Sequence, residues 1–155
     1  MKSFIYDAKR IVIKVGTSTL AHKTGMLNIR RVEELIKVIA DLKNSGKEIV
    51  FVTSGAIGVG VGKLGLSKRP TDMPTKQACA AIGQSELMYI YDKHFSEYNH
   101  NVAQVLLTRD IIESQSRKEN VTNTLSRLLD LSVIPIVNEN DTVAVEEIEF
   151  GDNDT

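Results

Sequence analysis

The sequence predicts an α/β fold, a three-layer αβα sandwich around a mainly parallel sheet. Short runs rich in Val and Ile alternate with longer segments whose apolar residues recur at helical spacing. Glycine-rich or Asn/Asp-rich segments follow several of the short runs, as expected where parallel strands end at one edge of a sheet. The 155 residues suffice for one domain with a buried core, and they contain no internal repeat or linker.

The first part of the chain predicts two strands, each followed by a helix. Residues 11–15 are a β-branched run that indicates a buried strand. Asn28 is placed to cap an amphipathic helix, and Gly46 is placed to end it. Residues 48–53 predict the second strand, and the glycine-rich segment 54–63 turns into the next helix.

The second part begins with a long helix. Pro74 is favourable at its start, and the apolar pattern runs towards His94. Small residues of this helix predict close packing against a neighbour: Ala78, Ala81 and Ser85. A strand, a helix and two further strands follow, at residues 101–107, 119–131, 133–137 and 144–150.

The composition excludes several classes of protein. With 42% hydrophobic and 25% charged residues, the chain is typical of a globular domain. A net charge of -1 gives no electrostatic reason to expect nucleic acid or an anionic membrane as a partner. Cys79 is the single cysteine and is expected to be a buried packing thiol. No signal-peptide pattern, spanning apolar run or His/Cys metal cluster appears, so we expect a cytoplasmic protein without protein-bound metal.

Four polar segments should converge at the carboxyl edge of the sheet, where ligands bind in open α/β folds. They are residues 16–18, 54–56, 138–141 and 151–154. The two Asn/Asp clusters could each be a simple turn. Because both follow predicted strands, together they favour a site for a small charged molecule.

Lys14 and the residues after it predict a phosphate site. A lysine in a buried strand is costly unless its charge is used. The backbone N–H groups of Gly16 and Thr17 can approach a phosphate closely. The alternative is an edge strand whose lysine faces water.

Ser54 offers a second anion contact. It precedes a predicted helix, so N–H groups at the start of that helix point where an anion could lie. The alternative is that Ser54 only caps the helix. A dinucleotide site is a further alternative, because Gly60, Gly62 and Gly65 match G-x-G-x-x-G. That match starts too far beyond the strand end at Thr53 to favour it.

Together, five segments resemble the amino acid kinase family, in family order and over nearly the whole chain. They are residues 13–18, 52–57, 104–108, 137–141 and 151–154. The pair Asn-Glu-Asn-Asp and Gly-Asp-Asn-Asp is similar to the members that act on glutamate. It differs from the kinases of acetylglutamate, aspartate, uridylate and carbamate.

The resemblance implies ATP-dependent phosphorylation of the γ-carboxylate of L-glutamate, the first step of proline synthesis. It implies that Mg²⁺ accompanies ATP and that proline is a feedback inhibitor. It assigns catalytic roles to Lys14 and Asp154, with Lys14, Gly16 and Thr17 at the nucleotide phosphates. It assigns the glutamate site to Ser54, Asp141 and Asn153, with Gly55, Asn138 and Asp152 beside them.

In this family the nucleotide base and ribose lie mainly on a carboxyl-terminal half. We therefore expect residues 1–155 to be the acceptor-binding part of a truncated amino acid kinase domain, inactive or weakly active alone. Apolar surface left by the missing half would favour a homo-oligomer. A non-catalytic amino-acid-binding or assembly module is the alternative.

Overall fold

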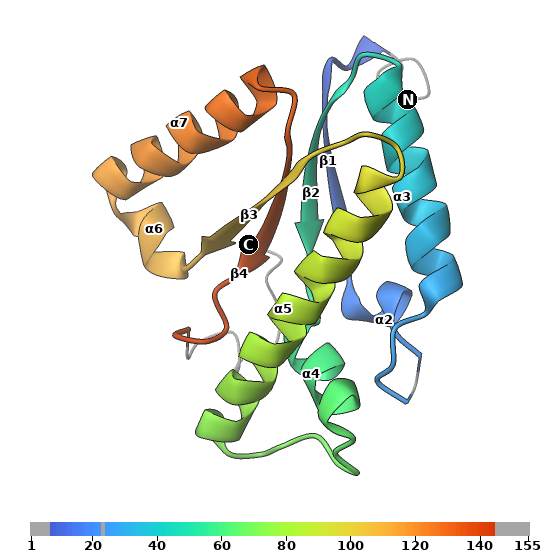
Figure 1. Ribbon diagram of the computed structural model, residues 1–155. Coiled ribbons are helices and arrows are strands. Elements are labelled where there is room, and N and C mark those ends of the chain that lie inside the picture. The colour runs from blue at the N-terminus through green and yellow to red at the C-terminus, as the bar shows by residue number, and fades with distance from the viewer. Residues whose placement is uncertain (1–6, 23, 145–155) are drawn as a thin grey trace.

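The computed structural model of the protein describes residues 7–22 and 24–144. Within these residues, four parallel strands form one sheet of order β1-β2-β4-β3, with helices on both faces (Figure 1). The strands are β1 (Arg10–Val15), β2 (Glu48–Thr53), β3 (Val102–Leu107) and β4 (Ile134–Glu139). The prediction of an αβα sandwich with a mainly parallel sheet is confirmed.

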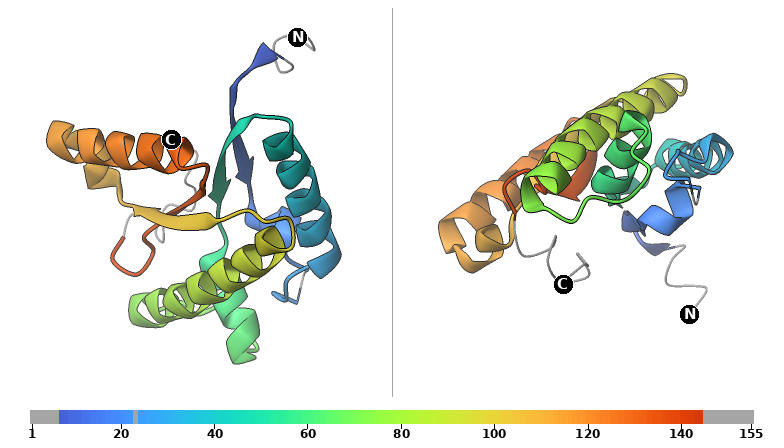
Figure 2. Two further views of the ribbon diagram at one scale, coloured as in Figure 1. Left: turned by 45° about the horizontal axis from the view of Figure 1, so that its top comes forward. Right: turned by 90° about the horizontal axis from the view of Figure 1, so that it is seen from below.

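The helices fill the connections between these strands. They are α2 (Thr17–Leu20), α3 (Ile29–Asn44), α4 (Ala56–Leu64), α5 (Met73–Ser96), α6 (Arg109–Glu113) and α7 (Gln115–Asp130). Seen from below, α4 and α5 lie on one side of β4, and α6 and α7 lie on the other (Figure 2). Each parallel crossover therefore places its helices on a face of the sheet.

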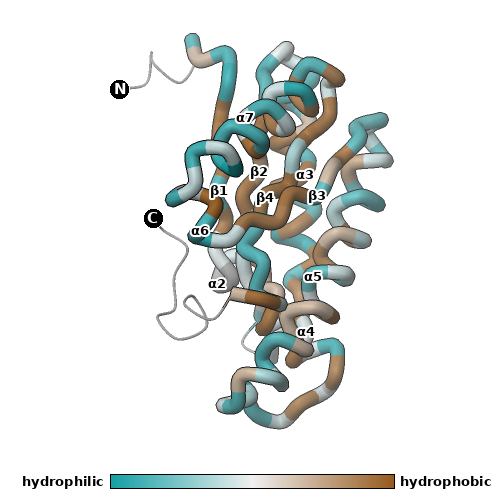
Figure 3. Tube along the Cα trace, turned by 90° about the vertical axis from the view of Figure 1, so that its left-hand side faces the viewer, coloured by the Kyte–Doolittle hydropathy of each residue, from teal (hydrophilic) through white to brown (hydrophobic). Residues whose placement is uncertain are grey.

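Two apolar clusters lie on opposite faces of the sheet. The larger cluster joins the strands to α3, α4 and α5, and its fully buried side chains include Ile36, Phe51 and Tyr91. The smaller cluster packs Leu129 of α7 against Val50 and Val137. Hydrophobic residues concentrate on the strands, whereas α7 is largely hydrophilic along its length (Figure 3).

Among the described strands β1 lies at the edge of the sheet, so the expectation of a buried strand was wrong and the edge-strand alternative was right. Ile13 packs against the larger cluster, whereas Val12 is 63% exposed and Lys14 is exposed. The described members of the smaller cluster come from β2, β3, β4 and α7, and none comes from β1. Side chains alternate between faces along a strand, so β1 has one covered face and one open face.

The ends of the long helices follow local capping signals. Asn28 caps α3 as predicted, and its side chain accepts a hydrogen bond from the Arg31 backbone N–H at 3.2 Å. Gly46 follows the helix with φ of 91°, a conformation that favours glycine. Helix α5 starts just before Pro74, with Asp72 as its cap.

Helices α4 and α5 cross with their backbones in close contact. A Cβ atom at Gly60 would lie 1.9 Å from the Cys79 carbonyl oxygen, and one at Gly83 would lie 1.7 Å from that of Ala56. Buried Cys79 is confirmed as a packing residue. The expectation that other small residues make this contact was wrong, because these are exposed: Ala78, Ala81 and Ser85.

The orientation of α5 explains that error. Leu87, Tyr91 and Phe95 are buried in the larger cluster at helical spacing. Gly83 lies on the same row one turn earlier, so it faces inward and the predicted residues face outward. Large apolar side chains, rather than small ones, therefore set which side of α5 meets α4.

Other differences concern element boundaries. Helix α7 begins four residues before its predicted start at residue 119, and the short helices α2 and α6 were not predicted. The strand predicted at 144–150 lies almost wholly outside the described residues. Within the described ranges, no helix is both long and apolar enough to cross a membrane.

Candidate functional site

The strand register brings the predicted polar segments to one edge of the sheet. Val15 pairs with Thr53, and Leu106 of β3 pairs with Asn138 of β4. Strands β2 and β4 are joined through Phe51↔Ile136 and Val52↔Val137. Residues 16–18, 54–56 and 138–141 therefore follow the same carboxyl edge, as predicted. The fourth segment, with Asp152, Asn153 and Asp154, lies outside the described residues.

The turn after β2 leads directly into α4. Gly55 caps the helix with φ of 94° and without a side-chain hydrogen bond. The alternative in which Ser54 caps α4 was therefore wrong. The Ser54 hydroxyl instead donates to the Val15 carbonyl at 3.3 Å, which joins the ends of β1 and β2. The N–H groups of the first turn of α4 lie at the carboxyl edge, where they favour an anion.

The turn after β1 is open at Gly16. Among the described atoms, none would lie within 4 Å of a Cβ at Gly16. Thr17 opens the short helix α2 directly after this glycine. Lys14 is exposed on the open face of β1, so the edge-strand geometry of the alternative is what the structure has. A long exposed lysine beside an open backbone turn is suitable for a phosphate.

A buried amide near the end of β4 leads into the turn that follows this strand. Asn138 is 3% exposed, and its Nδ2 donates to Oε1 of Gln84 on α5 at 2.7 Å. Its Oδ1 accepts from the Glu139 backbone N–H at 2.9 Å. Both ends of the Asn138 side chain therefore contact protein groups, and this residue shapes the turn.

Gln84 was missed by the sequence analysis. It lies one turn before Leu87 on the buried side of α5, where it is 7% exposed. A glutamine within an apolar helical row is the signal that could have found it, because buried polar groups require partners.

Asp141 is a partly buried carboxylate in the same turn. Burial and, as a smaller cause, the negative charge of Glu139 raise its pKa to about 6, against the opposing positive charge of Arg69. Arg69, in the connection between α4 and α5, was also missed by the sequence analysis. The backbone of the turn is held by a 2.7 Å hydrogen bond from the Asn140 N–H to the Leu107 carbonyl. Asp141 therefore follows an anchored backbone position, and its carboxyl is ionised above about pH 6.

The dinucleotide alternative is not supported by the packing of its three glycines. Gly60 contacts the backbone of Cys79, and a Cβ at Gly62 would lie 2.8 Å from the Gly25 carbonyl oxygen. Gly65 ends α4 in a left-handed conformation. These glycines lie within and after a helix rather than at a strand-to-helix turn, so they do not form a phosphate loop.

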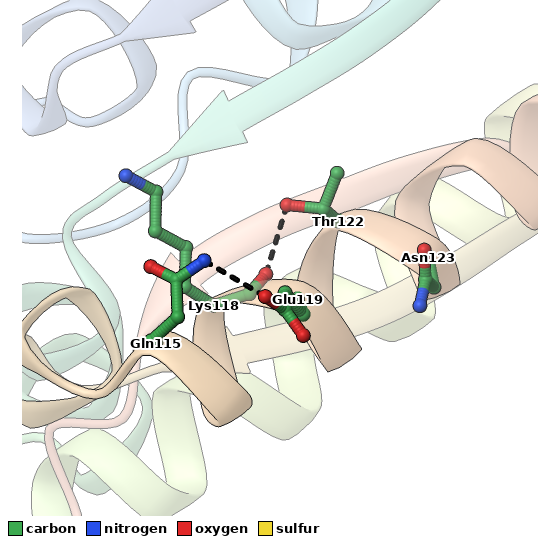
Figure 4. Close-up of a pocket in the computed structure, with 5 residues that line it drawn as sticks. All are labelled: Gln115, Lys118, Glu119, Thr122 and Asn123. Carbon is green, nitrogen blue, oxygen red and sulfur yellow. Dashed lines mark hydrogen bonds between the residues drawn. The ribbon is translucent and has the colours of Figure 1, made fainter.

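A hollow on the surface of α7 is lined by residues outside the carboxyl-edge segments. It is lined by Gln115, Lys118, Glu119, Thr122 and Asn123 (Figure 4). All five residues are exposed and belong to a single helix. In the parts of the chain that the structure describes, no group of three His, Cys, Asp or Glu residues could hold a metal ion.

Comparison with known proteins shows relatives over nearly the whole chain. The model of the amino acid kinase family matches residues 9–155. The chain is 56% identical over 158 aligned residues to the glutamate 5-kinase of Clostridium perfringens. The alignment covers 99% of this chain and 59% of that protein. It is 57% identical to the glutamate 5-kinase of Listeria welshimeri, over 99% of this chain and 57% of the relative. It is 59% identical to that of Moorella thermoacetica, over 96% of this chain and 39% of the relative. The chain thus spans less than two thirds of the length of these relatives.

Proposed function

The chain belongs to the amino acid kinase family, and from that premise we propose that it forms the glutamate-binding part of a glutamate 5-kinase. Such an enzyme transfers the γ-phosphoryl group of ATP to the γ-carboxylate of L-glutamate. The observation that carries the proposal is the convergence of the Gly16, Ser54 and Asn138 turns at one sheet edge. Relatives with this activity in their names are 56% to 59% identical. The reaction is the first step of proline synthesis, and a cytoplasmic location is part of the proposal.

The reaction requires positioning and charge neutralisation rather than a general base. The side-chain carboxyl of glutamate has a pKa of about 4.3, so the acceptor is already an anion at neutral pH. The obstacle is its approach to a polyanionic triphosphate. Lys14, with the backbone at Gly16 and Thr17, would neutralise and hold the phosphates. Asp154 would orient the lysines that contact them.

The acceptor site would hold both ends of the amino acid. Asp141 would pair with the α-ammonium, and a bound cation would favour its ionised form. Ser54 and Gly55, at the start of α4, would donate to a carboxylate. Asn153 would add a further contact. Asn138 and Asp152 would shape the surrounding turns.

Mg²⁺ would accompany the nucleotide. The described carboxylates form no cluster that could hold a metal ion by themselves. In proteins Mg²⁺ is usually held by phosphate oxygens with one or two carboxylates, and ATP would supply the phosphates. Bound with ATP, it supplies positive charge to the phosphates.

Proline is proposed as a feedback inhibitor because it shares the α-carboxylate and a cationic amine with glutamate. The same Asp141 carboxylate could pair with that amine. We also include self-association of the protein in the proposal, without nucleic acid or a membrane as partner.

Two measurements test this function. Titration calorimetry should detect binding of L-glutamate and L-proline, with D-glutamate as the control ligand. Asp141→Asn should weaken L-glutamate binding about tenfold to a hundredfold, because a charged pair becomes a neutral contact. Acyl phosphate formed from glutamate, ATP and Mg²⁺ can be trapped with hydroxylamine. Binding without acyl phosphate agrees with a glutamate-binding part that does not turn over by itself and also with a non-catalytic amino-acid-binding module. Robust acyl phosphate formation would contradict the expected inactivity and the non-catalytic module, and absence of binding would contradict both functions.

A further inference from the structure

Two buried hydrogen bonds join α5 to the ends of neighbouring strands. The Tyr91 hydroxyl lies 2.7 Å from the Thr53 hydroxyl at the end of β2. Gln84, seven residues earlier on the same side of the helix, accepts from Asn138 at 2.7 Å. The Tyr91 bond joins α5 to the end of β2 within the closed face of the sheet. The Gln84 bond joins α5 to Asn138, which precedes the turn that carries Asp141.

The orientation of both amides follows from one backbone donor. The Glu139 N–H can only donate, so the Asn138 atom that it meets at 2.9 Å is the oxygen. The amide nitrogen of Asn138 must therefore point to Gln84, and the atom of Gln84 that receives it is Oε1. The remaining Gln84 atom, Nε2, is buried and has no hydrogen-bond partner within the described structure.

This arrangement does not serve stability well. A buried N–H group without an acceptor is unfavourable, and an apolar side chain of similar shape would avoid it. Gln84 thus carries an unfavourable donor while its other branch holds Asn138. Polar groups kept against local stability are expected near functional sites.

We propose that Gln84 is a positioning residue for the amino acid acceptor. Through Asn138, near the end of β4, it positions the turn that follows this strand and with it the Asp141 carboxylate that would receive the substrate ammonium. The inference rests on the proposed function, because it assumes that Asp141 binds this ammonium.

The turn is fastened at two points, which explains how Gln84 can act from a distance. From α5, Gln84 holds Asn138, and Asn138 in turn holds the Glu139 N–H. From β3, the Leu107 carbonyl holds the Asn140 N–H at 2.7 Å. Without the acceptor at Gln84, the Asn138 side chain is free to rotate, so the Glu139 N–H loses a fixed partner. Asp141, two residues further on, then loses its set position.

The test compares glutamate with glutarate, which lacks the α-ammonium group. Gln84→Met removes the acceptor with little change of shape and should weaken L-glutamate binding about tenfold, as expected for one lost hydrogen bond. The weaker binding of glutarate should stay within about twofold, because Asp141 has no cation to hold in that ligand. Equal losses for both ligands would overturn the proposal, since they would indicate general damage to the site.

Matched variants separate positioning from folding. Tyr91→Phe removes the other buried bond of α5 and should leave both affinities within about twofold. The double variant Gln84→Met with Asn138→Ala should bind glutamate as weakly as Asn138→Ala alone. Independent, multiplying effects would contradict a role through Asn138. If Gln84→Met fails to fold, as judged by thermal unfolding, Gln84→Leu takes its place with the same expectations.

The failure of this inference can be told from failure of the proposed function. Wild-type protein that binds glutamate, together with unchanged binding by Gln84→Met, would overturn the role of Gln84 alone. Wild-type protein that does not bind glutamate would overturn the function and this role with it.

Discussion

The two faces of the sheet are built on different principles. Beneath α3, α4 and α5 the sheet is closed, and Ile49 and Phe51 are fully buried. On the other face α7 packs over β2 and β4 but not over β1, where Val12 is 63% exposed beside exposed Lys14. The closed face is held mainly by apolar packing. The open face presents the charge that the proposed chemistry would use, while the closed face supplies Gln84 to the same edge.

The largest loss of stability is expected on the closed face, where α4 and α5 cross. Gly83→Ala should lower the free energy of unfolding by at least about 3 kcal/mol, because its Cβ would lie 1.7 Å from the Ala56 carbonyl oxygen. Urea unfolding measures the loss. Ser85→Ala on the exposed side of the same helix is the control and should change stability by less than about 0.5 kcal/mol. A loss below about 1 kcal/mol for Gly83→Ala would show that the helices can separate easily.

A pair of substitutions in adjacent strands compares the faces directly. Ile49→Ala on the closed face should destabilise the protein by about 3 kcal/mol, through lost burial and a cavity. Val12→Ala on the open face should cost less than about 0.5 kcal/mol. Thermal or urea unfolding measures the loss of stability of each variant. Similar losses of unfolding free energy for both would mean that the open face is covered in solution.

Because of the Asp141 carboxyl, at the edge where the two faces meet, we expect the stability of the protein to depend on pH. Its pKa in the folded protein is raised to about 6. Between about pH 4 and pH 6 the folded state therefore binds more protons than the unfolded state, and stability falls as pH rises through this window. The full shift corresponds to roughly 3 kcal/mol, which solvent screening at this partly exposed group reduces to about 1 kcal/mol.

Asp141→Asn should remove this dependence and make the protein more stable by about 1 kcal/mol at pH 8. Urea unfolding at pH 4 and pH 8 measures both effects. Glutamate binding should show the opposite trend and strengthen as Asp141 ionises above about pH 6. Parallel pH profiles for the wild type and Asp141→Asn would contradict the assignment.

Lys14 should show the smallest effect on stability. Lys14→Met on the open face of β1 is expected to change the free energy of unfolding by less than about 0.5 kcal/mol. Affinity for inorganic triphosphate should fall about tenfold, since one charged contact is lost. Lys9→Met, near the start of the same strand, is the charge-matched control and should leave that affinity unchanged. Equal losses for both variants would point to nonspecific attraction.

Elements with strong local signals were predictable from the sequence. Strand β2 matches its predicted range, and Asn28 caps α3 because a side-chain oxygen there satisfies an early N–H group. The convergence of three turns follows from parallel strands, which is a matter of topology class. The sequence alone could therefore predict that Ser54 and Asp141 lie at the same edge of the sheet.

Features that depend on strand order or helix rotation were not predictable. The run at residues 11–15 looks like a central strand, yet β1 lies at the edge, and only the sheet order decides this. Leu87 and Tyr91 pack in the larger cluster and so determine which side of α5 is buried. As a result, Gly83 faces inward and Ser85 faces outward. Gln84 depends on the same rotation, so its partner Asn138 could not be identified from spacing.

The glycine contact between α4 and α5 has a consequence for acceptor choice. Gly83 touches Ala56, which starts α4 beside Ser54, and Gln84 is the next residue along α5. The turn after β2 and the turn after β4 are therefore linked through two helix backbones in close contact. Accommodating a shorter or longer dicarboxylic amino acid would require a shift of this helix pair. Exchanging side chains in the two turns would leave the distance between the turns unchanged.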